Sequence, residues 1–334
     1  MIRFIITICI SLLMSACSEA STQEWTTNYP SPITPKAYQA LLGRGLDVDW
    51  WGRNENDVYG NYTDKSVENF KQKGVGHIRI RLHHYNLTSN DFQRLKQQIN
   101  TCLKHGVIPI VAFSAKPYKE NPSEKEHKLV VDWWRKMAEE MSDYEDKLSF
   151  DLIIEPSDQL KKEPDELNSV YEDCVSAIRK TNPTRIIFIA PRKLSHPDKL
   201  CDLIIPTQGN NYLMAEWHFY AAGPEKDNPK KQWTTGTDYE KALITDQIEM
   251  AMDWQEQTGI YTWVGAWMPG NYNHGNSYSL NEQMTFAQFM CQELSKRKIP
   301  FAINTDKFFY NYATDSWVET YLPLMDVIFG GYKS

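Results

Sequence analysis

Residues able to do acid, base or ion-pair chemistry stand where short apolar runs of this sequence end. Residues 150–154 form such a run, and Glu155 and Pro156 follow it. A proline cannot donate to a strand ladder, so we predict that the strand stops at Glu155. A carboxyl group held there beside apolar neighbours can have a raised pKa and act as a general acid. A structural salt bridge is the alternative role for the same side chain.

Polar and aromatic side chains also follow the other apolar runs. The remaining strand ends carry Asp49, Trp50, Arg79, Arg81, His83, Ser114, His218, Tyr220, Ala266, Trp267, Asn304 and Asp306. The carboxyl-terminal ends of parallel strands in a barrel share one face, so these side chains are predicted to line one mouth. His218, with Tyr220 two residues later, is predicted to face a ligand. A histidine on a buried strand is otherwise a structural hydrogen-bonding residue.

The elements that must position these residues alternate between strand and helix. We predict strands at 46–51, 77–83, 107–113, 150–155, 185–190, 213–220, 261–267 and 300–304. Helices are predicted at 66–73, 91–105, 125–141, 163–180, 196–203, 239–257 and 281–298, with 315–328 closing the chain. This α/β pattern predicts a single-domain (β/α)8 TIM barrel over residues 36–334. A doubly wound open sheet is the alternative, but residues 48–53 lack its glycine-rich phosphate loop.

The first residues have the pattern of a secreted, lipid-anchored bacterial protein. Arg3 precedes an apolar run too short for a permanent membrane helix, so residues 1–16 are predicted to be a signal peptide. The run ends in a sequence that resembles the bacterial lipoprotein box, which places a lipid on Cys17. An ordinary secretion signal followed by a spare cysteine is the alternative. Ser18, by resemblance to sorted lipoproteins, favours the outer membrane, and residues 17–35, rich in Ser, Thr and Pro, are predicted to be a tether.

The composition of the chain restricts the classes of partner that it is expected to bind. The 334 residues carry a net charge of −7 without clusters of Lys and Arg, which argues against nucleic acid. The cysteines and the His, Asp and Glu residues have no metal-ligand spacing, so no metal or organic cofactor is expected. The 11 Trp and 18 Tyr suit stacking on the apolar faces of sugar rings as well as core packing.

Three of the strand-end motifs occur in a specific order. Residues 77–81 read His-Ile-Arg-Ile-Arg, 154–156 read Ile-Glu-Pro, and 217–220 read Trp-His-Phe-Tyr. Together these motifs resemble glycoside hydrolase family 5, the cellulase-like clan of TIM-barrel enzymes. The resemblance implies hydrolysis of O-glycosyl bonds in a polysaccharide or oligosaccharide. It places Glu155 as acid/base, Arg79 as the residue that orients the nucleophile, and His218 and Tyr220 in the catalytic site.

The chain also departs from the family pattern. Ile154 stands where the family has asparagine, Ser114 and Ala115 stand near the place of its third-strand histidine, and Ala266 stands where it has the nucleophilic glutamate. A retaining hydrolase needs two carboxyl groups on opposite sides of the scissile bond. The usual mechanism therefore requires a substitute acid. The candidates are Glu216, Asp47 and Asp49, each of which has a salt-bridging or barrel-interior role as the alternative.

The resemblance and these departures leave three functions open. One is a hydrolase with an altered mechanism. Another is a lyase on a uronic-acid polymer, in which Tyr220, Tyr272 or His218 takes the C5 proton and Arg79 or Arg81 neutralises the uronate. The third is a surface-anchored glycan receptor without catalysis, and we expect a monomer in each case. Trp267 and the polar loop after it are predicted to form a sugar platform. The expected substrate-binding residues are Trp50, Arg81, Trp267, Asn271, Tyr272 and Asn304.

Overall fold

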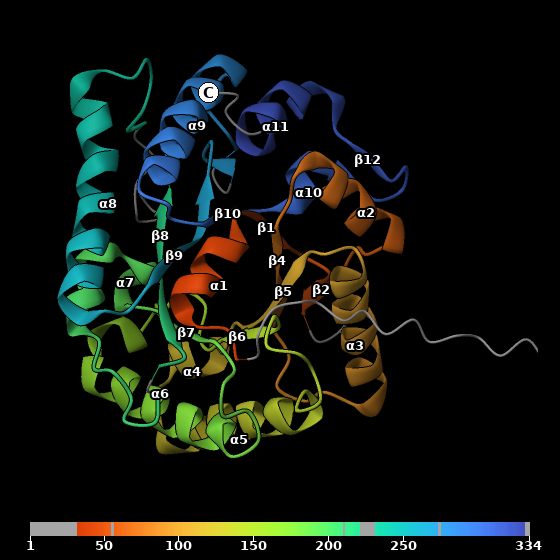
Figure 1. Ribbon diagram of the computed structural model, residues 1–334, viewed down its shortest axis with the longest axis vertical. Helices are drawn as coiled ribbons and strands as arrows, with labels where there is room; N and C mark the ends of the chain where they lie inside the picture. The colour runs from red at the N-terminus through yellow and green to blue at the C-terminus, as the bar shows by residue number, and fades with distance from the viewer. Residues whose placement is uncertain (1–31, 55–56, 210, 221–230, 273–274, 331–334) are drawn as a thin grey trace, which may run out of the picture.

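The structure is a computed structural model that describes residues 32–54, 57–209, 211–220, 231–272 and 275–330 (Figure 1). Among these residues, eight parallel strands close a barrel in the order β1, β10, β9, β8, β7, β6, β5, β4. Their bounds are β1 (Arg44–Val48), β4 (His77–Leu82), β5 (Ile108–Phe113), β6 (Ser149–Asp151), β7 (Ile187–Ile189), β8 (Leu213–Tyr220), β9 (Thr262–Met268) and β10 (Phe301–Ile303). The predicted single-domain (β/α)8 barrel is confirmed.

Helices surround the barrel, as Figure 1 shows. The α-helices are α1 (Pro35–Leu42), α2 (Asp64–Lys73), α3 (Ser89–Lys104), α4 (Lys116–Glu120), α5 (Glu124–Glu140), α6 (Pro164–Arg179), α7 (Arg192–Ser195), α8 (Asp238–Thr258), α9 (Leu280–Lys296), α10 (Asp306–Phe309) and α11 (Leu322–Phe329). Short 3-10 helices are η1 (Leu160–Lys162), η2 (Pro197–Asp202) and η4 (Glu319–Tyr321). Thr88, Thr237 and Ser279 begin α3, α8 and α9 with reciprocal capping boxes, which satisfy N–H groups that a helix start leaves free.

Helix α1 fills the amino-terminal end of the barrel. Tyr38 and Leu42 of α1 pack in one buried cluster with Phe188 and Trp263, which point into the barrel from β7 and β9. Sequence analysis did not anticipate this helix, because it predicted no element between the tether, which ends at residue 35, and the strand that begins at residue 46. Because apolar side chains fill this end, the polar side chains of the interior lie toward the opposite, carboxyl-terminal end.

Several element boundaries differ from the prediction. The first strand ends at Val48, and two hairpins, β2 (Trp51–Asn54) with β3 (Asp57–Tyr59) and β11 (Tyr310–Asn311) with β12 (Ser316–Trp317), were not predicted. The strand predicted to end at Glu155 ends at Asp151, and the chain continues irregularly to the glutamate. Within the described ranges, no helix is long and apolar enough to span a membrane.

Candidate active site

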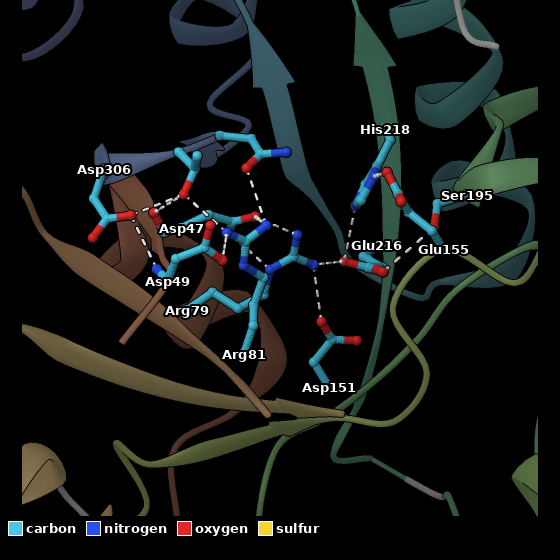
Figure 2. Close-up of polar contacts among 12 residues, drawn as sticks. Asp47, Asp49, Arg79, Arg81, Asp151, Glu155, Ser195, Glu216, His218 and Asp306 are labelled. Carbon is cyan, nitrogen blue, oxygen red and sulfur yellow. Dashed lines mark hydrogen bonds and ion pairs between the residues drawn. The ribbon is translucent and has the colours of Figure 1, made fainter. Parts of the chain in front are cut away.

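Arg79 lies at the centre of a buried charge cluster inside the barrel. Its Nε and Nη2 donate to the two carboxylate oxygens of Asp47, at 2.7 Å each. Its Nη1 donates to Asp151 Oδ2 at 3.0 Å and to Glu216 Oε2 at 2.7 Å (Figure 2). All four side chains are at most 1% exposed. Arg79 was predicted to orient a nucleophile, and in the structure it forms ion pairs with three buried acids of the barrel interior.

Two acids of this cluster, Asp151 and Glu216, have pKa values shifted in opposite directions. Burial and the negative charge of Glu216 raise the pKa of Asp151 to about 8, although Arg79 opposes them. Burial also works against ionisation of Glu216, but Arg79 and His218 hold the pKa of Glu216 below its usual value. Asp151 and Glu216 interact and therefore titrate as a pair, in which Arg79 and His218 favour the charged form of Glu216.

His218 connects this buried cluster to the mouth of the barrel. Its Nε2 lies 3.3 Å from Glu216 Oε2, and its Nδ1 lies 3.2 Å from Glu155 Oε1. Burial favours the neutral imidazole, but the charge of Glu216 and the hydrogen bonds to both carboxylates outweigh it and raise the pKa of His218 to about 9. The predicted partners Glu155 and His218 are therefore brought together. Through Glu216, His218 is also linked to Arg79.

The backbone around Glu155 is held in an uncommon conformation. Glu155 has a φ of 50°, in the left-handed region that side chains other than glycine rarely adopt. Just before it, the carbonyl of Ile154 accepts a hydrogen bond of 2.8 Å from Nζ of Lys119, a lysine that is 8% exposed. Strain of this kind persists only where the surroundings enforce it and often marks functional sites. Sequence analysis missed Lys119, because α4, which carries it, follows β5 without a periodic pattern.

A second strained turn supports the same region from the loop after β7. Lys193, Leu194 and Ser195 are three consecutive left-handed residues, with φ of 58°, 59° and 61°. Each costs roughly 1–2 kcal/mol relative to a right-handed conformation. The turn places the hydroxyl of Ser195 3.4 Å from Glu216 Oε1 and the N–H of Leu194 3.1 Å from the carbonyl of Pro156. Ser195 is a site residue that no motif in the sequence indicated.

Arg81 organises the other side of the mouth. It donates to Asp49 Oδ1 at 2.5 Å, to Asn304 Oδ1 at 3.0 Å and to Thr305 Oγ1 at 2.9 Å. Nζ of Lys307 lies 3.1 Å from Asp49 Oδ2, and the Lys307 side chain is 41% exposed. Three predicted mouth residues, Asp49, Arg81 and Asn304, thus form one hydrogen-bonded group at the ends of β1, β4 and β10.

Asp306 lies beneath this group. Its carboxylate accepts hydrogen bonds from the backbone N–H of Asp49, from Thr305 and from the Tyr312 hydroxyl. Burial raises the pKa of Asp306, partly offset by the hydrogen bond from Tyr312. Because Asp306 is fully buried, it supports the loop after β10 and does not reach a ligand.

Strand β9 contains one residue more than its neighbours require. Val264 and Ala266 of β9 pair with Trp217 and His218, which are consecutive residues of β8. The pairing of β9 with β10 is irregular in the same region. A β-bulge of this kind lets two successive side chains face one side. Ala266 pairs with His218, and a Cβ on Gly265 would lie 2.1 Å from Glu216 Oε2, so both positions face the interior.

The two tryptophans predicted to bind sugar are buried in the packing between strands and helices. Trp267 is fully buried and packs against Phe286 of α9 and Phe301 of β10. Trp50 is also fully buried, and its indole N–H donates to the Tyr312 hydroxyl at 2.8 Å. The sugar-platform prediction for Trp267 and the substrate-binding prediction for Trp50 were wrong, because both side chains are buried. The β9 bulge turns Trp267 away from the interior, and Trp50 lies between β1 and β2.

The loop residues predicted to bind substrate are engaged in contacts with their own loop or with neighbouring helices. Asn271 is 5% exposed, and its amide accepts from the Ser277 N–H at 2.7 Å and donates to the Ser277 hydroxyl at 3.0 Å. The Tyr272 hydroxyl bonds to Gln283, and its ring stacks on Phe308. These contacts stabilise the loop rather than offer groups to a ligand. The side chain of Tyr220, at the end of β8, lies outside the described part of the structure.

The raised pKa of His218 predicts a pH dependence of stability. Its full contribution is present below pH 6.5, the pKa of an unperturbed histidine, and is lost as the pH rises through about 9. The raised pKa of Asp151 acts in the same direction up to about pH 8. Titration of His218 alone is expected to lower the free energy of unfolding by about 3 kcal/mol between pH 6.5 and 9.5, and Asp151 deepens the fall. Denaturation by urea at a series of pH values measures it. The fall should shrink in His218→Gln and persist in the control His105→Gln, and an equal fall in both variants would contradict the assignment.

A TIM barrel with a glutamate and a histidine at its carboxyl-terminal mouth has the layout of a barrel enzyme. Residues 39–303 match the family described as Cellulase (glycosyl hydrolase family 5), so the chain belongs to this family.

Curated relatives and solved structures agree with this membership. Endoglucanase H of Acetivibrio thermocellus is 23% identical over 258 residues, which cover 72% of this chain and 28% of that protein. Endoglucanase C of the same organism is 24% identical over 180 residues, covering 47% of this chain and 50% of that protein. The chain thus spans at most half the length of these two relatives.

The solved structures support the fold. An endoglucanase from the hyperthermophilic Thermotoga maritima has a TM-score of 0.76 at 21% identity, covering 89% of this chain and all of that one (100%). The cellulose synthase subunit Z of Clostridioides difficile has a TM-score of 0.73 at 19% identity, covering 88% of this chain and 100% of that one.

Proposed function

We propose that this protein hydrolyses O-glycosyl bonds of a polysaccharide by an altered family 5 mechanism in which Glu155 serves as acid/base. The observation that carries the proposal is the Glu155 and His218 pair at the mouth, 3.2 Å apart. The raised pKa of His218 keeps a proton within this pair up to about pH 9. A general acid at neutral pH must hold a proton that it can give to the glycosidic oxygen, and His218 supplies one to Glu155 across their hydrogen bond. The names of the relatives, endoglucanases H and C, make a β-glucan the first substrate to test.

The mechanism is altered because we assign Ala266 to the position of the family nucleophile. Ala266 faces the interior opposite His218 on the seventh strand of the barrel, where the resemblance places that glutamate. A methyl group cannot attack an anomeric carbon. A covalent glycosyl-enzyme intermediate at this position is therefore not part of the proposed reaction.

Turnover is tested by incubating the purified protein with a panel of soluble β-glucans, β-mannans and uronic-acid polymers. Release of reducing ends supports hydrolysis, with heat-denatured protein as the control. Growth of ultraviolet absorbance from an unsaturated product, without new reducing ends from neutral glycans, would instead establish the lyase.

A glycan receptor is the second candidate, and a specific observation favours it. Glu216, the acid beside the neighbouring Gly265, is fully buried and bound to Arg79. A cleft that lost its nucleophile without replacement would still bind sugar. Retarded migration of the protein in gels containing one glycan, with no reducing ends released from any, would select the receptor over the hydrolase.

We further propose that the protein is a monomer anchored in the bacterial outer membrane through a lipid on Cys17, with residues 1–16 as signal peptide. Cys17 lies outside the described residues, so the support is the lipoprotein-box sequence and Ser18.

Cys17→Ser is expected to shift the protein from the membrane fraction to the soluble fraction, because the thioether that carries the lipid cannot form. Fractionation of cells and incorporation of labelled palmitate measure this shift. Cys201→Ser, at an exposed cysteine of the barrel, is the matched control and should leave both readouts unchanged. Palmitate incorporation into Cys17→Ser would refute the anchor.

A further inference from the structure

Glu216 is a buried acid to which the proposed reaction gives no role so far. Its side chain is 0% exposed, and a side chain without exposed surface acts through its neighbours. Its Oε2 accepts a hydrogen bond from Arg79 Nη1 at 2.7 Å and lies 3.3 Å from His218 Nε2. Its Oε1 lies 3.4 Å from the hydroxyl of Ser195. These partners lie on β4, β8 and the turn after β7, so both carboxylate oxygens are held in place (Figure 2).

Pairing with Arg79 does not by itself explain the presence of Glu216. Asp47 already binds Nε and Nη2 of Arg79, and Asp151 binds its Nη1. A further buried carboxylate is unfavourable unless another cation lies close to it. That cation is His218, whose Nε2 contacts Glu216. The role of Glu216 is therefore to be found in its contact with His218.

Strand β9 leaves room for this contact. A Cβ on Gly265 would lie 2.1 Å from Glu216 Oε2 and 2.8 Å from His218 Nε2. Side-chain carbons do not approach other atoms so closely, so any larger residue at this position would displace one of the two groups. The carboxylate and the imidazole thus meet where the neighbouring strand has no side chain.

The two ring nitrogens of His218 face two different carboxyl groups. Nε2 faces Glu216, and Nδ1 faces Glu155 Oε1 at 3.2 Å; the other charged side chains of this part of the interior are Arg79 and Asp151. Although burial opposes ionisation of Glu216, Arg79 and His218 hold its pKa below the usual value. An ionised carboxylate can only accept a hydrogen bond, so Nε2 must carry a hydrogen. The proton that titrates therefore lies between Nδ1 and Glu155.

We propose that Glu216 is a positioning residue that fixes the tautomer of His218, with hydrogen on Nε2, so that Nδ1 exchanges a proton with Glu155. The inference rests on the proposed hydrolase function. A buried carboxylate that orients a histidine in this way is an established catalytic device.

The proton transfers balance over one turnover. Glu155 gives its proton to the glycosidic oxygen, which keeps the electron pair of the bond that breaks at the anomeric carbon. The imidazolium of His218 then passes its Nδ1 proton to Glu155 and becomes neutral, while Nε2–H still donates to Glu216. Water supplies the hydroxyl of the new reducing end and releases its other proton to solvent, and solvent returns one proton to Nδ1.

The tautomer of His218 tests the inference without a substrate. Nitrogen NMR of protein carrying isotope-labelled histidine reports it, with the signal assigned by its loss in His218→Gln. At a pH above the His218 pKa of about 9, the neutral wild-type ring should carry its hydrogen on Nε2. In Glu216→Gln, Glu155 remains as the anionic partner, so the hydrogen should move to Nδ1.

Asp151→Asn is the matched control for this measurement. It removes another acid that binds Nη1 of Arg79, and it should leave the hydrogen of His218 on Nε2. Hydrogen on Nδ1 in the wild-type protein would overturn the inference, whether or not Glu216→Gln folds. The same tautomer in Glu216→Gln as in the wild-type protein would also overturn it.

Kinetics test the consequence for the reaction. Glu216→Gln is expected to lower kcat on a polysaccharide by about 10² to 10⁴ with little change in KM, because His218 no longer resupplies Glu155. An aryl β-glycoside that departs as a stable phenolate needs no proton and should be cleaved at nearly the wild-type rate. Equal slowing of both substrates, or wild-type kcat on the polysaccharide, would overturn the inference alone. If the wild-type protein hydrolysed no glycan while the tautomers were as expected, the proposed function would fail and the coupling of Glu216 to His218 would stand.

Discussion

Replacing Arg79 with methionine is expected to lower the free energy of unfolding by at least about 4 kcal/mol, a large share of the 5–15 kcal/mol that stabilises a typical domain. Methionine fills much of the space of the arginine stem but has no positive charge to neutralise the surrounding acids. Asp47, Asp151 and Glu216 would then share a fully buried site without their common cation. Urea denaturation at pH 7, followed by circular dichroism, measures the loss.

Two companion variants separate this explanation from general damage. Arg135→Met removes an arginine of α5 that is 46% exposed and pairs with Glu139. We expect a loss below about 1 kcal/mol there, because exposed ion pairs contribute little. Adding Asp47→Asn to Arg79→Met should recover part of the stability, since one unpaired carboxylate is removed. An Arg79→Met protein as stable as Arg135→Met would show that the buried charges are not held by Arg79.

The barrel was predictable from sequence because its long elements carry periodic apolar patterns. Strand β8 has the predicted bounds 213–220, and the long helices differ by one or two residues at most ends. Short elements were missed. Helix α1 spans 8 residues and β6 only 3, too few for periodicity to separate them from loop. Pro156 correctly indicated a break near Glu155. Strand β6 ends at Asp151, Leu152 and Ile154 still donate to the neighbouring strands, and the left-handed conformation follows at Glu155.

The site was predictable only where strict alternation along a strand holds. Glu216 and His218, two residues apart on β8, were expected on one face and contact each other. Trp263 and Trp267 are also an even number of residues apart on one strand, so strict alternation would place them on the same face. In the structure Trp263 points into the barrel and Trp267 points away from it. The extra residue in β9 reverses the face on which the following side chains lie, and no sequence pattern predicted this bulge.

Contacts made by loops were the other part that sequence could not supply. Ser195 and Lys119 reach the site from turns after β7 and β5, and neither belongs to a recognisable motif. Asp151 was visible as part of the fourth strand, but its contact with Arg79 depends on strands far apart in the sequence. The sequence thus predicts which residues stand at strand ends. The side chains that bind them and shift their pKa values are known only from the tertiary structure.

Glu155→Gln is expected to lower kcat on a polysaccharide by about 10² to 10⁴, because glutamine cannot donate the proton that the leaving sugar oxygen requires. The loss should depend on the leaving group. An aryl β-glycoside that departs as a stable phenolate needs no proton, so the variant should cleave it at nearly the wild-type rate. Steady-state kinetics on both substrates measure this contrast.

Glutamine still accepts a hydrogen bond from His218, so the variant tests chemistry with little change in packing at the mouth. Glu139→Gln, on the exposed face of α5, is the matched control and should retain wild-type kcat on both substrates. If Glu155→Gln slowed the aryl glycoside as much as the polysaccharide, Glu155 would act on the anomeric carbon or on binding. If it slowed neither, the proton would come from another group.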